Sequence, residues 1–124
     1  MSGPIITVKS SSTITEDFQE YVRDNWKNNP SPDFKGLAIR IAGAAGETGE
    51  WLEHMKKVIR NYNGDFNAYP KTKRDEARLE FGDALHYMVR CMQDFGFTLE
   101  EVMIFNIEKI TTCNQENPNW DKTP

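Results

Sequence analysis

The sequence of 124 residues has little cysteine and no long apolar run. Its two cysteines, Cys91 and Cys113, make neither a disulfide framework nor a metal-ligand spacing. Cys91 falls in an apolar helical pattern, so we expect a reduced, packed thiol there. No apolar run approaches the ~18 residues that span a bilayer. The first twelve residues, MSGPIITVKSSS, also lack the basic segment and long apolar run of a signal peptide. We therefore expect a cytoplasmic protein with no membrane partner.

A surplus of positive charge is also missing. Fifteen lysines and arginines face 19 aspartates and glutamates, which gives a net charge of −4. Proteins that bind nucleic acids usually carry a basic surplus, so this balance argues against that class. An acidic protein that binds an anionic substrate needs metal ions between the two negative charges.

The pattern of apolar residues predicts an all-α fold of four helices packed as a bundle, over residues 14–26, 34–62, 73–95 and 98–112. Thr13 with Glu16, and Thr98 with Glu101, have the spacing of capping boxes and mark the starts of the first and fourth helices. Gly96 marks the end of the third helix. We expect a single domain over residues 1–124, with an N-terminal arm (1–12) and a C-terminal tail (113–124).

The second and third helices should each bury one apolar stripe, because apolar residues recur at alternating spacings of three and four. On the second helix the stripe is Leu37, Ile41, Ala44, Thr48, Trp51, Met55, Val58 and Tyr62. On the third helix it is Ala77, Phe81, Ala84, Met88, Met92 and Phe95.

Beside these stripes, each of the two helices carries a pair of acids three residues apart. Glu47 and Glu50 lie in AGAAGETGEW, and Glu80 and Asp83 lie in EFGDALHYMV. Residues three apart project from nearly one side of a helix. If the two helices pack antiparallel, the acid pairs face each other. The glycines among them each cost the helix roughly 1 kcal/mol relative to alanine.

Four converging carboxylates repel one another and are costly to desolvate, so a positive charge must compensate them. Divalent cations with oxygen ligands fit best, and Mg²⁺ prefers a few carboxylates together with substrate phosphates and water. We expect two or more ions, with the glycines leaving room for metal, substrate or a neighbouring helix. The alternative is a solvated acidic face, which a single E-x-x-E pair usually is.

A di-iron or di-manganese bundle is a further alternative, and the histidines argue against it. That class uses Glu-x-x-His on two helices. Asp83 and His86 supply one D-x-x-H, but His54 follows Glu50 at a spacing of four.

On the fourth helix, Asn106 falls on a stripe of otherwise core-like positions, and Lys109 lies one turn further on. A buried amide needs hydrogen-bond partners. Either both residues face the acids, or Asn106 bonds to a neighbouring helix and Lys109 is exposed.

These segments together resemble the MazG-like nucleoside triphosphate pyrophosphohydrolases of the all-α NTP pyrophosphatase superfamily. The resemblance covers residues 36–110. It rests on AAGETGEW and EFGDALHYMV, which match the family's E-x-x-E and E-x-x-D signature, and on GFTLEEVMIFNIEKI, which is similar to its closing helix with an N-x-x-K element.

The resemblance implies Mg²⁺-dependent hydrolysis of a nucleoside triphosphate to the monophosphate and pyrophosphate, with Mn²⁺ able to substitute. It implies metal binding and catalysis by four residues, Glu47, Glu50, Glu80 and Asp83. It places Asn106 and Lys109 on the substrate's phosphates and Tyr87 near the nucleotide. It also implies a homodimer or homotetramer with sites between helices of neighbouring subunits.

Other side chains are candidates for supporting roles. Lys109, together with Arg90 or Lys57, is expected to neutralise charge on the pyrophosphate. Glu53 is an outer-shell carboxylate or base, or simply a solvated residue, since it lies roughly 120° around the helix from Glu47. The candidates for stacking on the base are Trp26, Phe66, Tyr69 and Tyr87, each of which can also be plain packing.

The resemblance does not identify the substrate. The loop NYNGDFNAYPKTKRDE is long compared with the family's, and Trp120 in the tail has no counterpart in the family. A purine ring stacks over more aromatic surface, which favours dGTP. The alternatives are a related dUTP or phosphoribosyl-ATP pyrophosphohydrolase, and a catalytically silent helical adaptor on the same scaffold.

Overall fold

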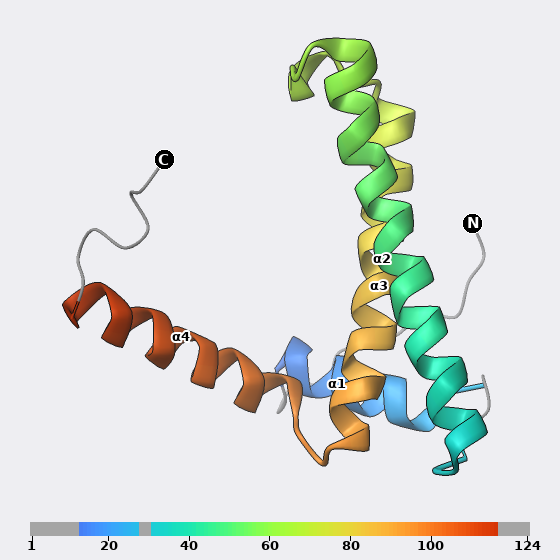
Figure 1. The fold of residues 1–124 in the computed structure, drawn as a ribbon, viewed down its shortest axis with the longest axis vertical. Coiled ribbons are helices and arrows are strands. Elements are labelled where there is room, and N and C mark those ends of the chain that lie inside the picture. Colours follow the sequence, from blue (N-terminus) through green and yellow to red (C-terminus); the bar gives the residue numbers. More distant parts are fainter. Residues whose placement is uncertain (1–12, 28–30, 117–124) are drawn as a thin grey trace.

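The computed structural model describes residues 13–27 and 31–116, and over these residues it contains four α-helices, one short 3-10 turn and no strand. The predicted all-α, bundle-like fold is confirmed. Helices α2 (Phe34–Tyr62) and α3 (Lys71–Asp94) form a long antiparallel hairpin. Helix α1 (Ile14–Asp24) packs against α3, and α4 (Leu99–Glu116) packs against α1 and runs away from the hairpin (Figure 1).

The predicted caps are present at the starts of α1 and α4, as one bond of the capping box at Thr13 and as the complete box at Thr98. The hydroxyl of Thr13 accepts a hydrogen bond from the backbone N–H of Glu16 at 3.2 Å. Thr98 and Glu101 bond reciprocally, each side chain accepting from the other's backbone N–H at 3.1 and 3.3 Å. These bonds satisfy backbone donors that a helix leaves unpaired at its first turn.

The predicted bounds are wrong at some helix ends. Helix α1 ends at Asp24 instead of residue 26, and α3 begins two residues earlier than expected, after Pro70. Helix α4 continues to Glu116, so the first four residues of the predicted tail are helical. The predicted arm, residues 28–30 and Trp120 lie outside the described residues.

The bounds of α2 are as predicted, and its caps explain why it starts and stops there. The Asp33 carboxylate accepts a hydrogen bond from the backbone N–H of Gly36 at 2.8 Å. At the other end, Asn63 has a left-handed conformation with φ of 58°, followed by Gly64 with φ of 79°. Asn and Gly adopt this conformation at low cost. The chain then passes through the 3-10 turn η1 (Phe66–Ala68) into α3.

A small apolar core joins α1, α3 and α4 at the lower end of the hairpin. Val22, Val89 and Leu99 are buried together, with Phe18, Trp26 and Met92 packed around them. Polar contacts of Gln19 join the same three helices. Its backbone carbonyl accepts from the Gln93 side chain at 2.9 Å, and its side-chain oxygen accepts from the backbone N–H of Leu99 at 3.2 Å.

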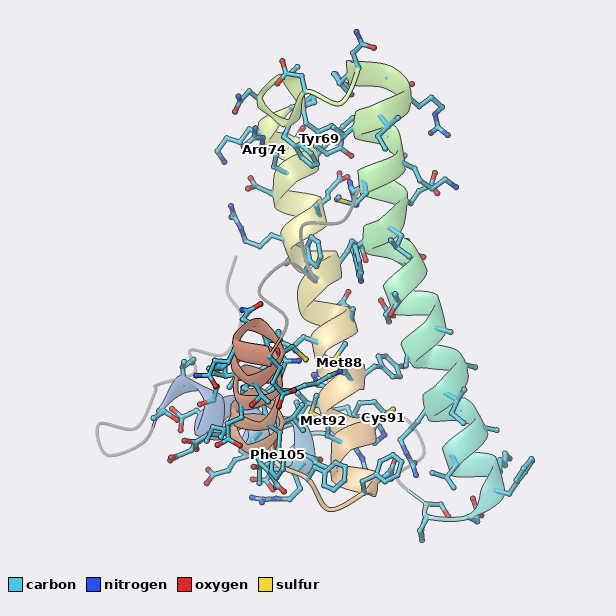
Figure 2. The ribbon with its side chains drawn as sticks, turned by 60° about the vertical axis from the view of Figure 1, so that its left-hand side comes forward. Tyr69, Arg74, Met88, Cys91, Met92 and Phe105 are labelled. Carbon is cyan, nitrogen blue, oxygen red and sulfur yellow. The ribbon has the colours of Figure 1, made fainter. Side chains whose placement is uncertain are left out.

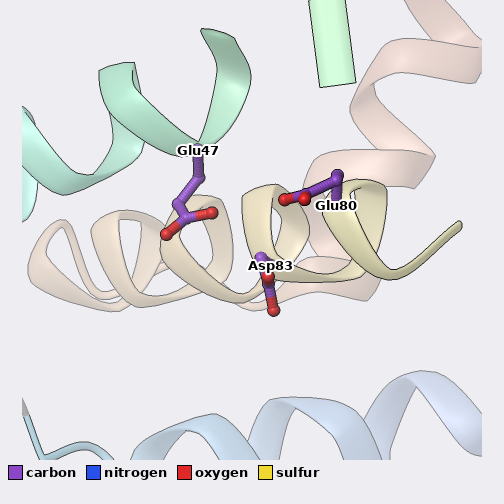
Figure 3. A group of neighbouring side chains, drawn as sticks. All are labelled: Glu47, Glu80 and Asp83. Atoms are coloured by element: carbon purple, nitrogen blue, oxygen red, sulfur yellow. The ribbon is translucent and has the colours of Figure 1, made fainter. Parts of the chain in front are cut away.

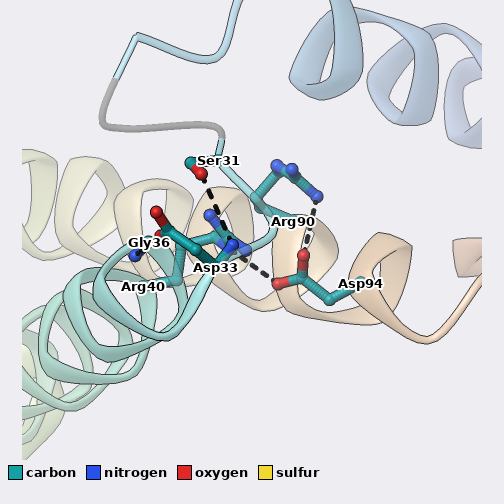
Figure 4. A network of polar contacts seen from close by, with 6 residues as sticks. All are labelled: Ser31, Asp33, Gly36, Arg40, Arg90 and Asp94. Atoms are coloured by element: carbon teal, nitrogen blue, oxygen red, sulfur yellow. Dashed lines mark hydrogen bonds and ion pairs between the residues drawn. The ribbon is translucent and has the colours of Figure 1, made fainter.

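A buried charge network joins α2 to the end of α3. The side chain of Arg40, on α2, is fully buried. Its Nε donates to Oδ2 of Asp94 at 2.7 Å, while Nη1 of Arg90 donates to Oδ1 of the same carboxylate at 3.3 Å (Figure 4). Asp94 therefore holds two arginines from two helices, and this fixes the register of the hairpin.

The apolar stripes are buried only in part. Val58 and Ala84 are buried, but Ile41 is 66% exposed and Phe95 is 77% exposed. Helix α4 is also apolar on its surface, where Phe105 is 67% exposed and Ile107 is 64% exposed. The large apolar side chains that the described part of the chain exposes are therefore too many to be single scattered residues.

Two further expectations concern the membrane and the thiols. None of the helices in the described ranges is both long enough and apolar enough to cross a bilayer. Cys91 and Cys113 are both free thiols and both half-buried. Burial raises the pKa of the Cys91 thiol, as expected of a packed cysteine.

Candidate functional site

The register of the hairpin brings acids of α2 and α3 together. Glu47 of α2 points toward α3, which carries Glu80 and Asp83 (Figure 3). One carboxylate oxygen from each of the three residues lies within 4.8 Å of the other two. The antiparallel packing expected from the sequence is therefore present, and three of the four predicted metal-binding residues form one group, which we call the acidic triad.

The acidic triad carries negative charge that its surroundings do not balance. The pKa of Glu47 is raised, first by desolvation and then by the charges of Asp83, Glu80 and Glu50. None of these four carboxylates forms an ion pair with another residue in the described ranges. Like charges held this close make the ionised form of Glu47 unfavourable. The triad is therefore a place where a cation would relieve a repulsion.

The donor set fits a hard divalent cation. All three ligand atoms are carboxylate oxygens, which Mg²⁺, Ca²⁺ and Mn²⁺ prefer over nitrogen or sulfur. Glu50, the fourth predicted ligand, is exposed and lies outside the triad, although its charge acts on Glu47. Three carboxylates leave coordination positions open for water or phosphate oxygens.

The glycines around the triad fall into two kinds. A Cβ at Gly43 would overlap the ring of Tyr87, so that glycine lets an α3 side chain pack on α2. At Gly46, Gly49 and Gly82 a Cβ would meet no atom within 4 Å. The described chain therefore does not need these three glycines for its own packing, and their helix cost is not explained by the single chain.

Aromatic rings surround Tyr87 on the lower side of the triad. Trp26 stacks on His86 with ring centroids 5.2 Å apart, and the ring of Tyr87 meets Trp26 edge-on at 5.0 Å. The guanidinium of Arg90 lies 5.8 Å from the centre of the Trp26 ring. Burial lowers the pKa of His86, and the Asp83 charge opposes that shift only in part. Trp26, just after α1, thus contacts His86, Tyr87 and Arg90 of α3.

Two other predicted residues lie further along α2. Glu53 pairs with Lys56 at 3.3 Å and with Arg60 at 3.8 Å. The hydrogen bond and charge of Lys56 lower the pKa of Glu53, with a smaller effect from Arg60. These surface pairs match the solvated alternative for Glu53. Lys57 is half-buried on the same helix.

The residues predicted on the fourth helix are not brought to the triad by a single chain. Asn106 and Lys109 are exposed on α4, which packs against α1 and runs away from the hairpin (Figure 1). The expectation that Asn106 occupies a core position is wrong for the described chain. Its apolar neighbours on α4 are exposed as well, because no other helix in the described ranges covers that face.

The sequence did not predict a cavity of about 360 Å³ between α2 and α3 on the upper side of the triad. It is lined by Trp51, His54, Met55, Val58, Phe66, Tyr69, Arg74, Ala77, Arg78 and Phe81. Trp51 and Phe81 stack with ring centroids 4.8 Å apart and an angle of 23° between the rings. Figure 2 shows Tyr69 and Arg74 at the end of the hairpin, where α2 connects to α3. Phe66 and Tyr69, two of the candidates for base stacking, are among the residues that line this cavity.

Comparison with known proteins adds little beyond the geometry. The chain is 28% identical over 76 residues to the Gene 37 protein of Mycobacterium phage L5, which covers 61% of this chain and 64% of the relative. The chain therefore matches less than two thirds of the length of that relative, whose name states no activity. No known protein family matches the chain, and no solved structure does.

Proposed function

We propose that the protein is a Mg²⁺-dependent nucleoside triphosphate pyrophosphohydrolase, which converts a nucleoside or deoxynucleoside triphosphate to the monophosphate and pyrophosphate. The observation that carries this proposal is the acidic triad, which combines three clustered carboxylates with an uncompensated charge. The resemblance of the surrounding segments to the MazG-like family supplies the reaction. The exposed neighbour Glu50 completes the signature.

In this proposal the acids hold and orient the substrate through divalent cations. When bound, Mg²⁺ or Mn²⁺ supplies positive charge to the phosphate oxygens and makes a nearby water more acidic. The cation would be held by Glu47 from one helix and by Glu80 and Asp83 from the other, so the packing of the hairpin fixes the spacing of these ligands. Glu50 lies at the exposed edge, where a carboxylate can orient the attacking water or hold a second ion. Lys57 is a candidate for neutralising the leaving pyrophosphate.

We further propose that the active form is a cytoplasmic homodimer or homotetramer. Exposed apolar residues of α4, including Phe105 and Ile107, support a second copy covering this face. A neighbouring α4 would bring a second set of Asn106 and Lys109 to a triad that its own α4 does not reach. The open space beside Gly46 and Gly49 leaves room for such an approach.

The test is a panel of standard and modified nucleoside triphosphates, with dUTP and phosphoribosyl-ATP included, incubated with Mg²⁺ and analysed for phosphate products. We expect pyrophosphate and the monophosphate. Asp83→Asn and Glu50→Gln should abolish pyrophosphate release without loss of helical content. Asp75→Asn, which alters exposed ion pairs with Lys71 and Arg78, is the matched control and should remain active.

Three outcomes would contradict the proposal. Release of orthophosphate would overturn the reaction type, and full activity in both acid variants would overturn the metal site. Tight Mn²⁺ binding with no turnover of any triphosphate would favour the silent adaptor instead.

A further inference from the structure

We propose that the cavity at the upper end of the hairpin is a second ligand site, which binds a small planar aromatic carboxylate. This site is separate from the acidic triad and does not depend on the proposed function. None of the triad residues lines the cavity. On α3 the lining residues recur at spacings of three and four and share one face. Glu80 and Asp83 lie roughly 110° and 170° around the helix from the middle of that face.

The walls of the cavity suit a flat apolar ring. Its volume of about 360 Å³ lies within the range of small-molecule sites. The stacked rings of Trp51 and Phe81 form part of its lining. Phe81 and Phe66 are nevertheless 47% and 53% exposed, so aromatic surface of the lining remains in contact with water. A ligand ring that covers these side chains removes apolar area from water and stacks on them.

The wall next to the connection between the helices is already fixed. Tyr69 is buried, and its hydroxyl lies 2.6 Å from Nδ1 of His54. The ring of Tyr62 meets the ring of Tyr69 edge-on, with centroids 5.4 Å apart. Side chains that are held before binding lose little conformational freedom when a ligand arrives.

The charge at the cavity is positive and only partly balanced. Its lining contains Arg74 and Arg78 and, among the described residues, no aspartate or glutamate. Arg78 pairs with Asp75 at 3.3 Å, and the same carboxylate pairs with Lys71 at 2.9 Å. Arg74 forms no ion pair with a carboxylate in the described ranges. One arginine without a carboxylate partner matches a ligand group with a single negative charge, which a carboxylate has.

Arg74 is oriented before any ligand binds. Its Nε donates to the backbone carbonyl of Tyr69 at 3.1 Å, and its Nη2 donates to the backbone carbonyl of Phe66. Figure 2 shows Arg74 beside Tyr69 at the end of the hairpin. Carbonyl groups are neutral, so these bonds hold the guanidinium without cancelling its charge. A guanidinium has further N–H donors, and charge-assisted bonds to a carboxylate are among the strong hydrogen bonds of proteins.

The experiment measures binding by calorimetry at pH 7 in EDTA with two probes. The first is 2-naphthoate, and the second is 2-naphthamide, which has the same rings and no charge. The wild type should bind naphthoate saturably and at least about tenfold more tightly than naphthamide, because the amide loses the charge-assisted bonds. Replacing EDTA with Mg²⁺ should leave both affinities unchanged. Equal affinity for the two probes, or naphthoate binding only in Mg²⁺, would overturn the proposal.

Three variants assign the site to particular residues. Arg74→Met should abolish the preference for naphthoate over naphthamide. Lys73→Met removes a positive charge from the same helical turn at a position outside the lining, so this matched control should keep the preference. Ala77→Phe, which fills the cavity, should weaken both probes at least about tenfold, since the stacking surface is lost. Circular dichroism checks the helical content of each variant.

The carbonyl bonds of Arg74 also hold the connection between the helices, so Arg74→Met can lower the helical content. In that case the preference of the wild type and the loss in Ala77→Phe decide the question. With helical content intact, a preference that survives Arg74→Met, or that Lys73→Met abolishes equally, would show that Arg74 does not bind the carboxylate.

The remaining outcomes test the location of the ligand. Unchanged affinity in Ala77→Phe would place the probe elsewhere, and a loss in Phe105→Ala would place it on the exposed apolar face of α4. An affinity that falls as the protein concentration rises would show that a second copy covers the cavity. Each of these results overturns the proposal, and pyrophosphate release by the wild type would still leave the proposed function standing.

Discussion

Two charged clusters bridge α2 and α3, only two helical turns apart on α2, and they balance their charge in opposite ways. In the lower cluster, the carboxylate of Asp94 is shared by Arg40 and Arg90, and Arg40 is fully buried. In the upper cluster, Glu47, Glu80 and Asp83 converge with no cation among the described residues. Both clusters depend on the same hairpin register.

The difference separates a structural role from a functional one. Ion pairs whose charges balance within the chain fix how two helices pack, and they leave no excess charge for a ligand to neutralise. A group of like charges destabilises the folded state unless a ligand binds and neutralises them. Such groups are typical of functional sites. The raised pKa of Glu47 and the open space beside Gly46 are both features expected of a functional site.

The largest effect should come from breaking the lower cluster. Asp94→Ala leaves the buried Arg40 guanidinium without its carboxylate, and removing one partner of a buried pair costs about 3–5 kcal/mol. We expect the urea midpoint to fall accordingly at fixed protein concentration. The control is Asp75→Ala, which removes exposed ion pairs with Lys71 and Arg78 and should cost at most about 1 kcal/mol. Equal losses in the two variants would contradict the structural role.

The glycines provide the next largest contrast. Gly43→Ala puts a methyl group into the ring of Tyr87 and should destabilise the protein by about 1–3 kcal/mol. Gly46→Ala, three residues further on, meets no atom of the described chain and should stabilise it by about 1 kcal/mol. Chemical denaturation of the two variants measures both changes. A loss at Gly46 in the metal-free protein would show that this space is already occupied, for example by a second copy.

The smallest effect concerns the charge of the acidic triad. The folded pKa of Glu47 lies above its ordinary value, so between those two values the folded state binds more protons than the unfolded state. Stability therefore falls as pH rises through this window and stays lower above it. Glu47→Gln removes the ionisation, and without metal it should raise the Tm at pH 7 by a few degrees. Thermal unfolding from pH 4 to 8 should show a flatter profile for the variant, and an equal or lower Tm at pH 7 would argue against the repulsion.

Much of the fold followed from local patterns in the sequence. The capping residues Thr13 and Thr98 and the apolar repeat of α2 are local signals, and each placed a helix correctly. The meeting of Glu47 with Asp83 needed only an antiparallel hairpin, which the connecting loop allowed. Three of the four acids could therefore be grouped from the sequence alone.

The remaining features depend on contacts between distant residues. Arg40 and Asp94 are 54 residues apart, and nothing near either one indicates that they pair. Trp51 and Phe81 both fit an apolar stripe, so their spacing alone could not reveal a cavity beside them. The direction of α4 depends on how Leu99 and Gln19 meet at its first turn, and a helical pattern carries no such information.

Calorimetric titration of Mn²⁺ into the metal-free protein tests the central claim most directly. The wild type should show saturable binding at pH 7, and Asp83→Asn should lower the affinity at least tenfold, because it removes one charged ligand from the acidic triad. Asp75→Asn should bind as the wild type does. Absence of saturable binding, or equal affinity for the wild type and Asp83→Asn, would contradict the account of the triad as a cation site.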